Sequence, residues 1–124
     1  MWSHGTFYWN ELMTRDAEQA KRFYADCLDW TYDAMPMEGM TYFVAKSGDK
    51  TVGGIFQLGG PEHADVPESW MGYIAVDDID ARVEKAVAAG AQVIRPVFEV
   101  PGIGRIAILH EPGGAAIGWI TPGS

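Results

Sequence analysis

The sequence of 124 residues predicts an α+β fold built from two tandem βαβββ modules. The first observation is an internal repeat with an offset of 62 residues, because residues 9–16 and 71–78 each lead into a helical pattern. The second is that each copy ends in a strand-like segment, at residues 54–58 and 116–120. Since two such modules can enclose a cleft, we expect a curved mixed β-sheet cleft.

The repeat also predicts how the chain is organised. We expect a single domain spanning residues 1–124, with repeat one at about 6–58 and repeat two at about 69–121. Between them, residues 59–68 are polar and contain proline, which is typical of a linker.

In the first repeat, residues 6–14 alternate between two faces as a strand does. Asp16 is placed to cap a helix, and Gln19 three residues later completes a capping box. The apolar helix face is predicted from spacings of three and four, and consists of Ala20, Phe23, Tyr24 and Cys27. We expect the helix to end near Leu28 and Asp29. Strands should follow at about 30–36, 40–46 and 51–58, separated by turns at 36–39 and 47–50.

The second repeat has the same order. A strand at about 70–76 leads to Asp78 as the helix cap, and Gly90 is placed just past the helix end, where φ is positive. Further strands are predicted at about 91–98, 104–110 and 115–120.

Composition narrows the function classes. The formal net charge of −8 disfavours binding to phosphate backbones, so we expect no nucleic-acid partner. No apolar run is long enough to span a bilayer and no signal peptide is visible, so we expect no membrane partner. The single cysteine, Cys27, cannot form an internal disulfide, which favours a cytoplasmic location.

Several short motifs carry a family resemblance. They are Asp16-Ala17, Phe23-Tyr24, Leu28-Asp29-Trp30, Val76-Asp77-Asp78-Ile79-Asp80, Ala89-Gly90-Ala91 and Glu111-Pro112-Gly113-Gly114. In this order and in duplicate, they make the chain resemble the vicinal oxygen chelate superfamily of glyoxalases, bleomycin resistance proteins and extradiol dioxygenases. The resemblance implies the glyoxalase/bleomycin-resistance fold. Residues 9–12 and 100–105 resemble most a bacterial branch whose members carry a hydroxylase name. Asp29 stands where that family's turn usually has glycine, and aspartate tolerates the left-handed conformation.

The resemblance also locates a metal centre that this chain lacks the donors to build. In metal-dependent members each half supplies two ligands, and the matching positions here are Trp9, Phe56, Met71 and Gly118. Indole, phenyl and hydrogen offer no donor, and a thioether is a poor ligand for hard divalent ions. We therefore expect no metal site and no cofactor.

Other residues could act in the cleft. Glu11 shares a strand face with Trp9 and Met13, where desolvation should raise its pKa and allow general acid or base catalysis. Alternatively, Glu11 is a structural charge that pairs with Arg105 or lies at a solvated rim. The candidate ligand-binding residues are Trp9, Phe56, Met71, Tyr73, Arg105, Gly118 and Trp119. At equivalent positions of the two repeats, Phe56 has a bulky side chain and Gly118 has none, which could leave space for a ligand near Gly118. A closed core filled by Trp9 and Phe56 is the alternative.

Three functions stay open at this point. The first is a metal-independent binder of a small hydrophobic or aromatic molecule in the inter-repeat cleft. The second is a metal-independent enzyme, such as a lyase, isomerase or hydroxylase-like protein, that uses Glu11 for proton transfer. The third is a non-catalytic interaction protein with a collapsed cleft. Whether the chain is an enzyme is left undecided, and open curved sheets favour a homodimer.

Overall fold

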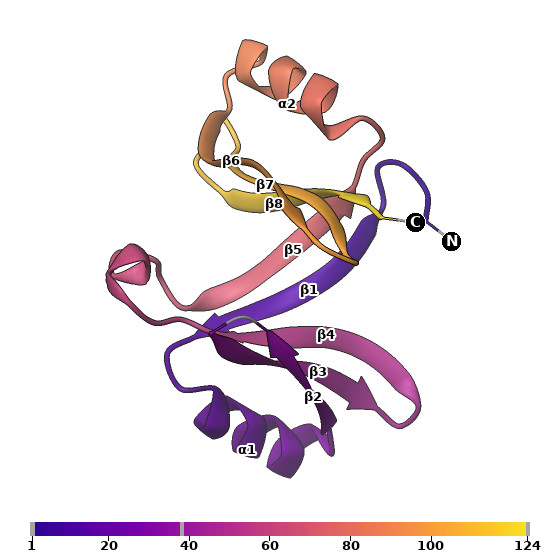
Figure 1. Cartoon of the computed structure of the whole chain (residues 1–124), viewed down its shortest axis with the longest axis vertical. Helices are drawn as coiled ribbons and strands as arrows, with labels where there is room; N and C mark the ends of the chain where they lie inside the picture. Colours follow the sequence, from indigo (N-terminus) through magenta and orange to yellow (C-terminus); the bar gives the residue numbers. More distant parts are fainter. Residues whose placement is uncertain (1, 38, 124) are drawn as a thin grey trace. The chain divides into compact units, whose positions relative to one another are not determined.

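The computed structural model describes residues 2–37 and 39–123 and divides into two compact units (Figure 1). The first module is Trp9–Trp70. The second module comprises Met71–Ser124 together with Met1–Tyr8. Both divisions fall inside strands, namely β1 (Phe7–Thr14) and β5 (Ser69–Ala75).

The first module has the predicted β-α-β-β-β order. After β1 come α1 (Ala17–Leu28), β2 (Thr31–Met37), β3 (Met40–Ser47) and β4 (Lys50–Gln57), and a short 3-10 turn, η1 (Pro61–His63). The strands lie in the order β2-β3-β4-β1, with β1 parallel to β4 and the other neighbours antiparallel. The turn predicted at 36–39 includes residue 38, which lies outside the described residues.

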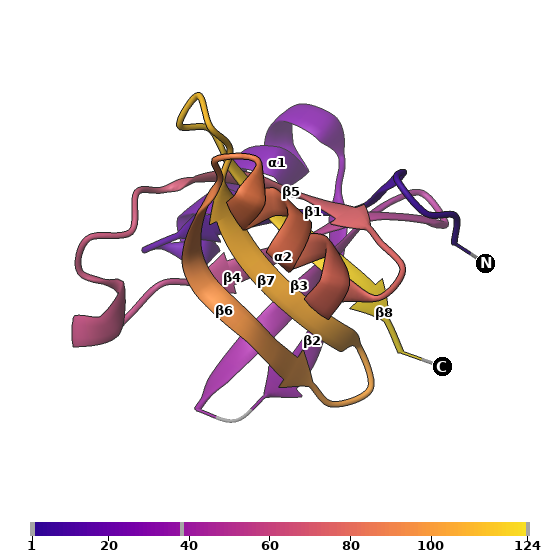
Figure 2. The ribbon, with the colours of Figure 1, turned by 90° about the horizontal axis from the view of Figure 1, so that it is seen from above.

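The second module repeats this topology. It contains β5, α2 (Ile79–Ala88), β6 (Gln92–Val100), β7 (Gly104–His110) and β8 (Ala116–Pro122). The strand order is β5-β8-β7-β6, and β5 runs parallel to β8. Figure 2 shows α2 lying across β6 and β7. The α+β class with tandem βαβββ modules is therefore confirmed, while the division into one domain with a linker at 59–68 stays a prediction.

Both helices begin at the predicted aspartates, but the predicted capping box is wrong in one half, because the Asp16 backbone N–H donates to the Thr14 hydroxyl at 3.2 Å and not to Gln19. Asp16 accepts a hydrogen bond from the backbone N–H of Gln19 at 3.0 Å, and Asp78 accepts one from Ala81 at 3.3 Å. Asp29 ends α1 in the left-handed conformation with φ of 59°, and Gly90 follows α2 with φ of 106°. Across the described residues, neither helix has the length and apolarity needed to cross a membrane.

The predicted apolar face of α1 is partly wrong. Phe23 is 57% exposed and Cys27 is exposed, whereas Ala17 is buried and Tyr24 is half-buried. Because successive helical residues are about 100° apart, the packed stripe that includes positions 17 and 24 leaves positions 23 and 27 toward solvent. Cys27 is thus a surface thiol and not a packing residue.

The second module has a compact apolar core beneath its helix. Val76, Ile79 and Ala107 form a buried cluster at the junction of β5, α2 and β7. Partly buried side chains pack around this cluster, and they are Ile74, Val83, Val97 and Trp119. This packing holds α2 against one face of the sheet.

The segment after β4 is anchored to the end of β1. Arg15 donates from its guanidinium to the carbonyl oxygens of His63 at 2.9 Å and Val66 at 2.8 Å. Glu68 accepts from the Thr14 hydroxyl at 2.8 Å and from the Arg15 backbone N–H at 3.1 Å. These hydrogen bonds hold the pKa of Glu68 below its ordinary value, and the hydrogen bond from Thr14 has the largest effect.

This anchor predicts a pH-dependent contribution to stability. Because the folded pKa of Glu68 is lowered, its contribution is present above the ordinary value of 4.5 and is lost as pH falls through the folded pKa. Glu68→Gln should therefore be less stable than the unaltered protein at pH 7, and the difference should narrow below pH 4.5. Urea unfolding followed by tryptophan fluorescence at several pH values measures this. Glu111→Gln makes the same charge change in an exposed turn and is the control. A constant difference between Glu68→Gln and the unaltered protein from neutral to acidic pH would contradict the assignment.

Candidate functional site

The first module carries a half-exposed sheet face on the side opposite α1. The strand register places Glu11 beside Gly54 and Met13 beside Phe56, and β3 places Val44 beside Gly54. Because side chains alternate along a strand, these residues share one face. Leu12, Phe43 and Ile55 share the other, where Lys21 of α1 lies 3.6 Å from the centre of the Phe43 ring. We call the side with Glu11 the helix-free face of the first module.

Two aromatic side chains are tied together on this helix-free face. The indole N–H of Trp9 donates to the Tyr42 hydroxyl at 2.9 Å. The Tyr42 phenol in turn lies over Gly54, so that a Cβ at residue 54 would overlap its ring and oxygen. Only glycine at residue 54 leaves room for the Tyr42 ring. The hydrogen bond from Trp9 holds the two rings next to each other.

Glu11 lies in the middle of this arrangement. It is half-buried, follows Trp9 by two residues on β1 and stands beside Gly54 in the register. The combination of aromatic rings, one phenol and one carboxylate is suited to hold an apolar molecule and to exchange a proton with it. The raised pKa expected for Glu11 stays a prediction.

Phe56 lies further along the same face. Its partner in the register is Met13, so it is displaced along the strand from Trp9. The Phe56 ring meets the imidazole of His63 edge-on, with 5.5 Å between ring centres. Trp9 and Phe56 therefore flank Glu11 from opposite directions on one sheet face.

In the second module, the predicted residues divide between two faces. Met71 and Tyr73 share a face by alternation, and Tyr73 stands beside Gly118 in the register. Trp119 pairs with Ile74 on the other face, where it packs against the core beneath α2. Trp119 is thus separated from Met71, Tyr73 and Gly118 by the thickness of the sheet.

The space expected at Gly118 is filled. A Cβ at residue 118 would overlap the Tyr73 ring, which lies directly over this glycine. Tyr73 is itself only 8% exposed. The absent side chain at 118 makes room for a tyrosine of the same module and leaves no gap.

The register also corrects the predicted equivalence of Phe56 and Gly118. The offset of 62 carries Glu11 to Tyr73, but it carries Gly54 to Ala116, whereas Tyr73 pairs with Gly118. Gly118 therefore corresponds in the sheet to Gly54. In both modules, a glycine of the last strand lies beneath a tyrosine ring.

The residues at the family's metal positions do not fit a divalent ion. The first module offers the Trp9 indole, with either Phe56 or, in the corrected register, Gly54. The second offers the Met71 thioether and Gly118. None of these is an imidazole or carboxylate donor, and within residues 2–37 and 39–123 no three His, Cys, Asp or Glu side chains group to hold an ion. Metal independence stays a prediction.

Arg105 is engaged within its own module. Its guanidinium forms an ion pair with Asp80 of α2, with a second contact at 3.4 Å. The hydrogen bond and the charge of Asp80 raise the pKa of Arg105. The pairing with Asp80 was not predicted, although Asp80 in the first turn of α2 is a natural partner for a basic side chain.

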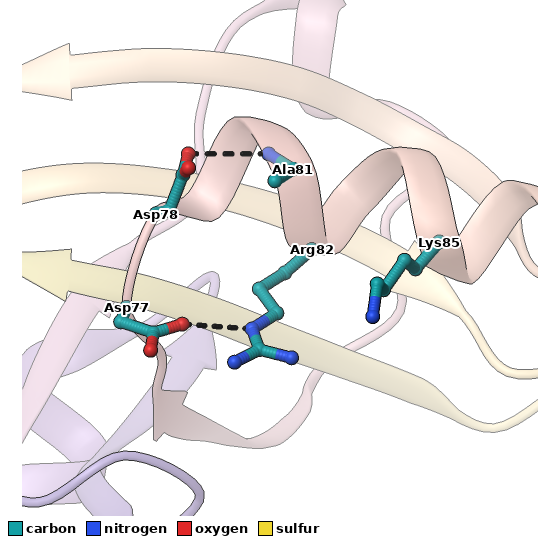
Figure 3. Close-up of a pocket in the computed structure, with 5 residues that line it drawn as sticks. All are labelled: Asp77, Asp78, Ala81, Arg82 and Lys85. Atoms are coloured by element: carbon teal, nitrogen blue, oxygen red, sulfur yellow. Dashed lines mark hydrogen bonds and ion pairs between the residues drawn. The ribbon is translucent and has the colours of Figure 1, made fainter.

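A surface hollow of about 370 Å³ lies at the start of α2 (Figure 3). Its lining consists of Asp77, Asp78, Ala81, Arg82 and Lys85. The Nε of Arg82 donates to Asp77 at 2.8 Å, and this hydrogen bond, reinforced by the charge of Arg82, lowers the pKa of Asp77. The sequence analysis missed this group, although Arg82 and Lys85 have the spacing of three that places side chains on one side of a helix.

Comparison with known proteins gives a family match. The family model described as "Glyoxalase/Bleomycin resistance protein/Dioxygenase superfamily" matches residues 6–118. CFP32 of Mycobacterium bovis, which is provisionally named a glyoxylase, is 41% identical over 119 residues, covering 95% of this chain and 44% of that protein. The anthracycline biosynthesis protein DnrV of Streptomyces peucetius is 30% identical over 120 residues, covering 87% of this chain and 44% of DnrV. The chain thus spans less than half the length of these curated relatives.

Solved structures share the fold. Methylmalonyl-CoA epimerase from Mycobacterium tuberculosis has a TM-score of 0.69 at 13% identity, covering 100% of this chain and 94% of that one. A hypothetical protein, BH1468, from Bacillus halodurans has a TM-score of 0.71 at 15% identity, covering 98% and 97%. At these identities the likeness concerns the fold alone.

Gly54→Ala tests the arrangement of the helix-free face. The added methyl group must displace the Tyr42 ring, which breaks the Trp9–Tyr42 hydrogen bond and should destabilise the protein by about 1–3 kcal/mol. Denaturant unfolding and the NMR shift of the Trp9 indole N–H measure both effects. In the matched control Gly59→Ala, the new Cβ meets nothing within 4 Å, so stability should change little. Equal effects of the two substitutions would refute the packing of Tyr42 on Gly54.

Proposed function

Because the chain belongs to the glyoxalase/bleomycin resistance protein/dioxygenase superfamily, we propose that it binds a small hydrophobic or aromatic molecule without a metal ion. The proposed site is the helix-free face of the first module. The observation that carries the proposal is the pair of hydrogen-bonded rings, Trp9 and Tyr42, beside the half-buried carboxylate of Glu11. Small-molecule sites are mostly apolar and aromatic, with a few polar groups that fix the orientation of the ligand.

The geometry favours a flat, apolar ligand. The indole of Trp9 and the ring of Phe56 provide apolar surface on either side of Glu11, and stacking on such rings contributes about 0.5–1.5 kcal/mol each. The Tyr42 hydroxyl accepts a hydrogen bond from the indole N–H of Trp9, which holds the two rings beside each other as a polar-edged aromatic surface. Glu11 would disfavour an anionic ligand at the same place.

Some solved structures with this fold are named for complexes with small molecules. One is titled methylmalonyl-CoA epimerase in complex with methylmalonyl-CoA and NH4+, with a TM-score of 0.68 at 15% identity. That title describes the epimerase. It supports the present proposal only to the extent that the fold accommodates a small ligand.

Metal-independent proton transfer by Glu11 is the second candidate function. Its supporting observation is the position of a half-buried carboxylate next to aromatic side chains, where desolvation favours the protonated acid. In this case, the ligand would be a carbonyl or aromatic substrate that exchanges a proton with Glu11. Binding without turnover separates the first function from the second.

A cytoplasmic homodimer is part of the same proposal. The single cysteine suits a reducing compartment, and exposed apolar side chains such as Phe23, Leu28 and Trp70 support a surface buried by a second copy. Light scattering coupled to size exclusion measures the mass in solution.

A fragment screen tests binding. Neutral aromatic compounds should raise the melting temperature equally with and without EDTA. For the best compound, Trp9→Leu should weaken binding about tenfold, the loss of one stacking and hydrogen-bonding partner. The control Trp70→Leu removes a 43% exposed tryptophan that bonds to Tyr24 of α1, and it should leave the affinity unchanged. A screen without hits, or hits abolished by EDTA, would refute the proposal and favour an interaction protein or a metal-dependent one.

Glu11→Gln separates binding from catalysis. If Glu11 transfers protons, any turnover of a bound compound should fall by roughly two to four orders of magnitude, while the affinity and the melting temperature stay nearly the same. Proton exchange with solvent deuterium, followed by NMR, detects such turnover. Exchange that persists in Glu11→Gln would exclude this residue as the acid or base.

A further inference from the structure

A groove lies beside α2 in the second module. It has a volume of about 420 Å³, within the range of small-molecule sites. Its apolar lining consists of Ile74, Val76, Ala86 and Trp119. Trp119 is half-buried and packs with one side against the core, so its remaining surface faces the groove.

The ionisable side chains that line the groove are all basic. They are His4, Arg82 and Lys85, and no carboxylate belongs to the lining. Figure 3 shows the Arg82 and Lys85 side chains extending from the same side of α2. The basic lining of this groove contrasts with the chain as a whole, whose formal net charge is −8.

Lys85 is the cation available to a ligand. Its side chain is exposed, and within the described residues its ammonium group forms no ion pair or hydrogen bond. Arg82 uses its Nε for Asp77, which leaves its two terminal nitrogen atoms for other acceptors. The groove therefore combines apolar surface with at least one uncompensated positive charge.

His4 adds a further donor. Its Nδ1 accepts the backbone N–H of Asp77 at 3.0 Å, which places the proton of the neutral ring on Nε2. The carboxylates of Asp77 and Asp78 line the adjoining hollow together with Arg82 and Lys85, and Asp77 is paired with Arg82. These carboxylates reduce the attraction of an anion to Arg82, so the exposed ammonium group of Lys85 is the main cationic contact in the groove.

We propose that this groove is a second ligand site, which takes a small carboxylate with an aromatic or aliphatic body. The body covers Ile74, Val76 and Trp119, and the carboxylate meets Lys85 and the free guanidinium nitrogen atoms of Arg82. A purely inorganic anion would leave the apolar surface uncovered. A neutral aromatic molecule would leave the ammonium group without a partner.

This site does not depend on the function proposed for the first module. Trp119 lies on the sheet face toward α2, whereas the first module's site lies on a face free of helix and contains a carboxylate. The two sites therefore prefer ligands of different charge, and each can fail without the other.

Titration with 2-naphthoate and the neutral 2-naphthamide tests the groove. In ¹H–¹⁵N NMR spectra, 2-naphthoate should shift the Trp119 indole N–H and the backbone signals of Arg82 and Lys85. Its affinity should exceed that of 2-naphthamide about fivefold, because the amide lacks the charge. Shifts confined to other residues, or equal affinities of the two compounds, would overturn the proposal.

A charge reversal with a matched control completes the experiment. Lys85→Glu should weaken 2-naphthoate binding about tenfold by isothermal titration calorimetry, because an attraction is replaced by a repulsion. Lys50→Glu makes the same change in net charge at an exposed position of the first module and should have no effect. An equal loss in both variants would show that 2-naphthoate responds only to net charge, and the groove would then not be its site.

Discussion

In each module, the packing of the sheet depends on a glycine in the last strand, at the point where this strand pairs with the first strand. Gly54 and Gly118 stand beside the first strand of their own modules, at Glu11 and Tyr73 respectively, and each lies beneath a tyrosine ring. Parallel pairing of these two strands joins the beginning and the end of each βαβββ module in one sheet. Since a Cβ at either glycine would overlap the ring, the packing on this face and the pairing of the strands are fixed by the same residue.

The two modules use this constraint differently. In the first, the covering ring comes from β3, as Tyr42, and is held by Trp9. In the second, the covering ring comes from β5, as Tyr73, the register partner of the glycine itself. The first module is therefore left with a carboxylate beside its glycine, and the second with a buried phenol ring. For this reason, only the first module presents a carboxylate beside the glycine of its last strand.

Much of the fold could be predicted because its signals are local. Alternation along the strands, the aspartate caps at 16 and 78, and Gly90 after α2 place the α-helices and strands of the described residues to within about two residues, whereas η1 was not predicted. The family resemblance drawn from short motifs is confirmed by the match over residues 6–118. The register between the first and last strands could not be predicted, because it joins segments far apart in sequence and shifts by two residues between repeats. That shift explains why the predicted equivalent of Gly118 is Phe56, whereas the structure shows it to be Gly54.

Some residues of the candidate site could be predicted from the sequence, but the contacts between them could not. Trp9 and Glu11 follow from alternation along β1, but the hydrogen bond between Trp9 and Tyr42 depends on side-chain conformation, which the sequence does not reveal. The sequence predicts Arg105 and Trp119 to be ligand-binding residues of the cleft, Arg105 because it starts a strand and Trp119 because it is aromatic. The structure gives Arg105 a partner on α2 and places Trp119 on the opposite sheet face.

The anchoring of residues 61–68 has a practical consequence for dissecting the chain. Arg15 and Thr14 hold this stretch against the end of β1. It is therefore part of the first module, although its composition is typical of a linker. A fragment cut at residue 59 would lose these bonds and leave a guanidinium group and a hydroxyl without their acceptors. A truncation meant to yield an isolated half should therefore retain the chain through Trp70, where the compact unit ends.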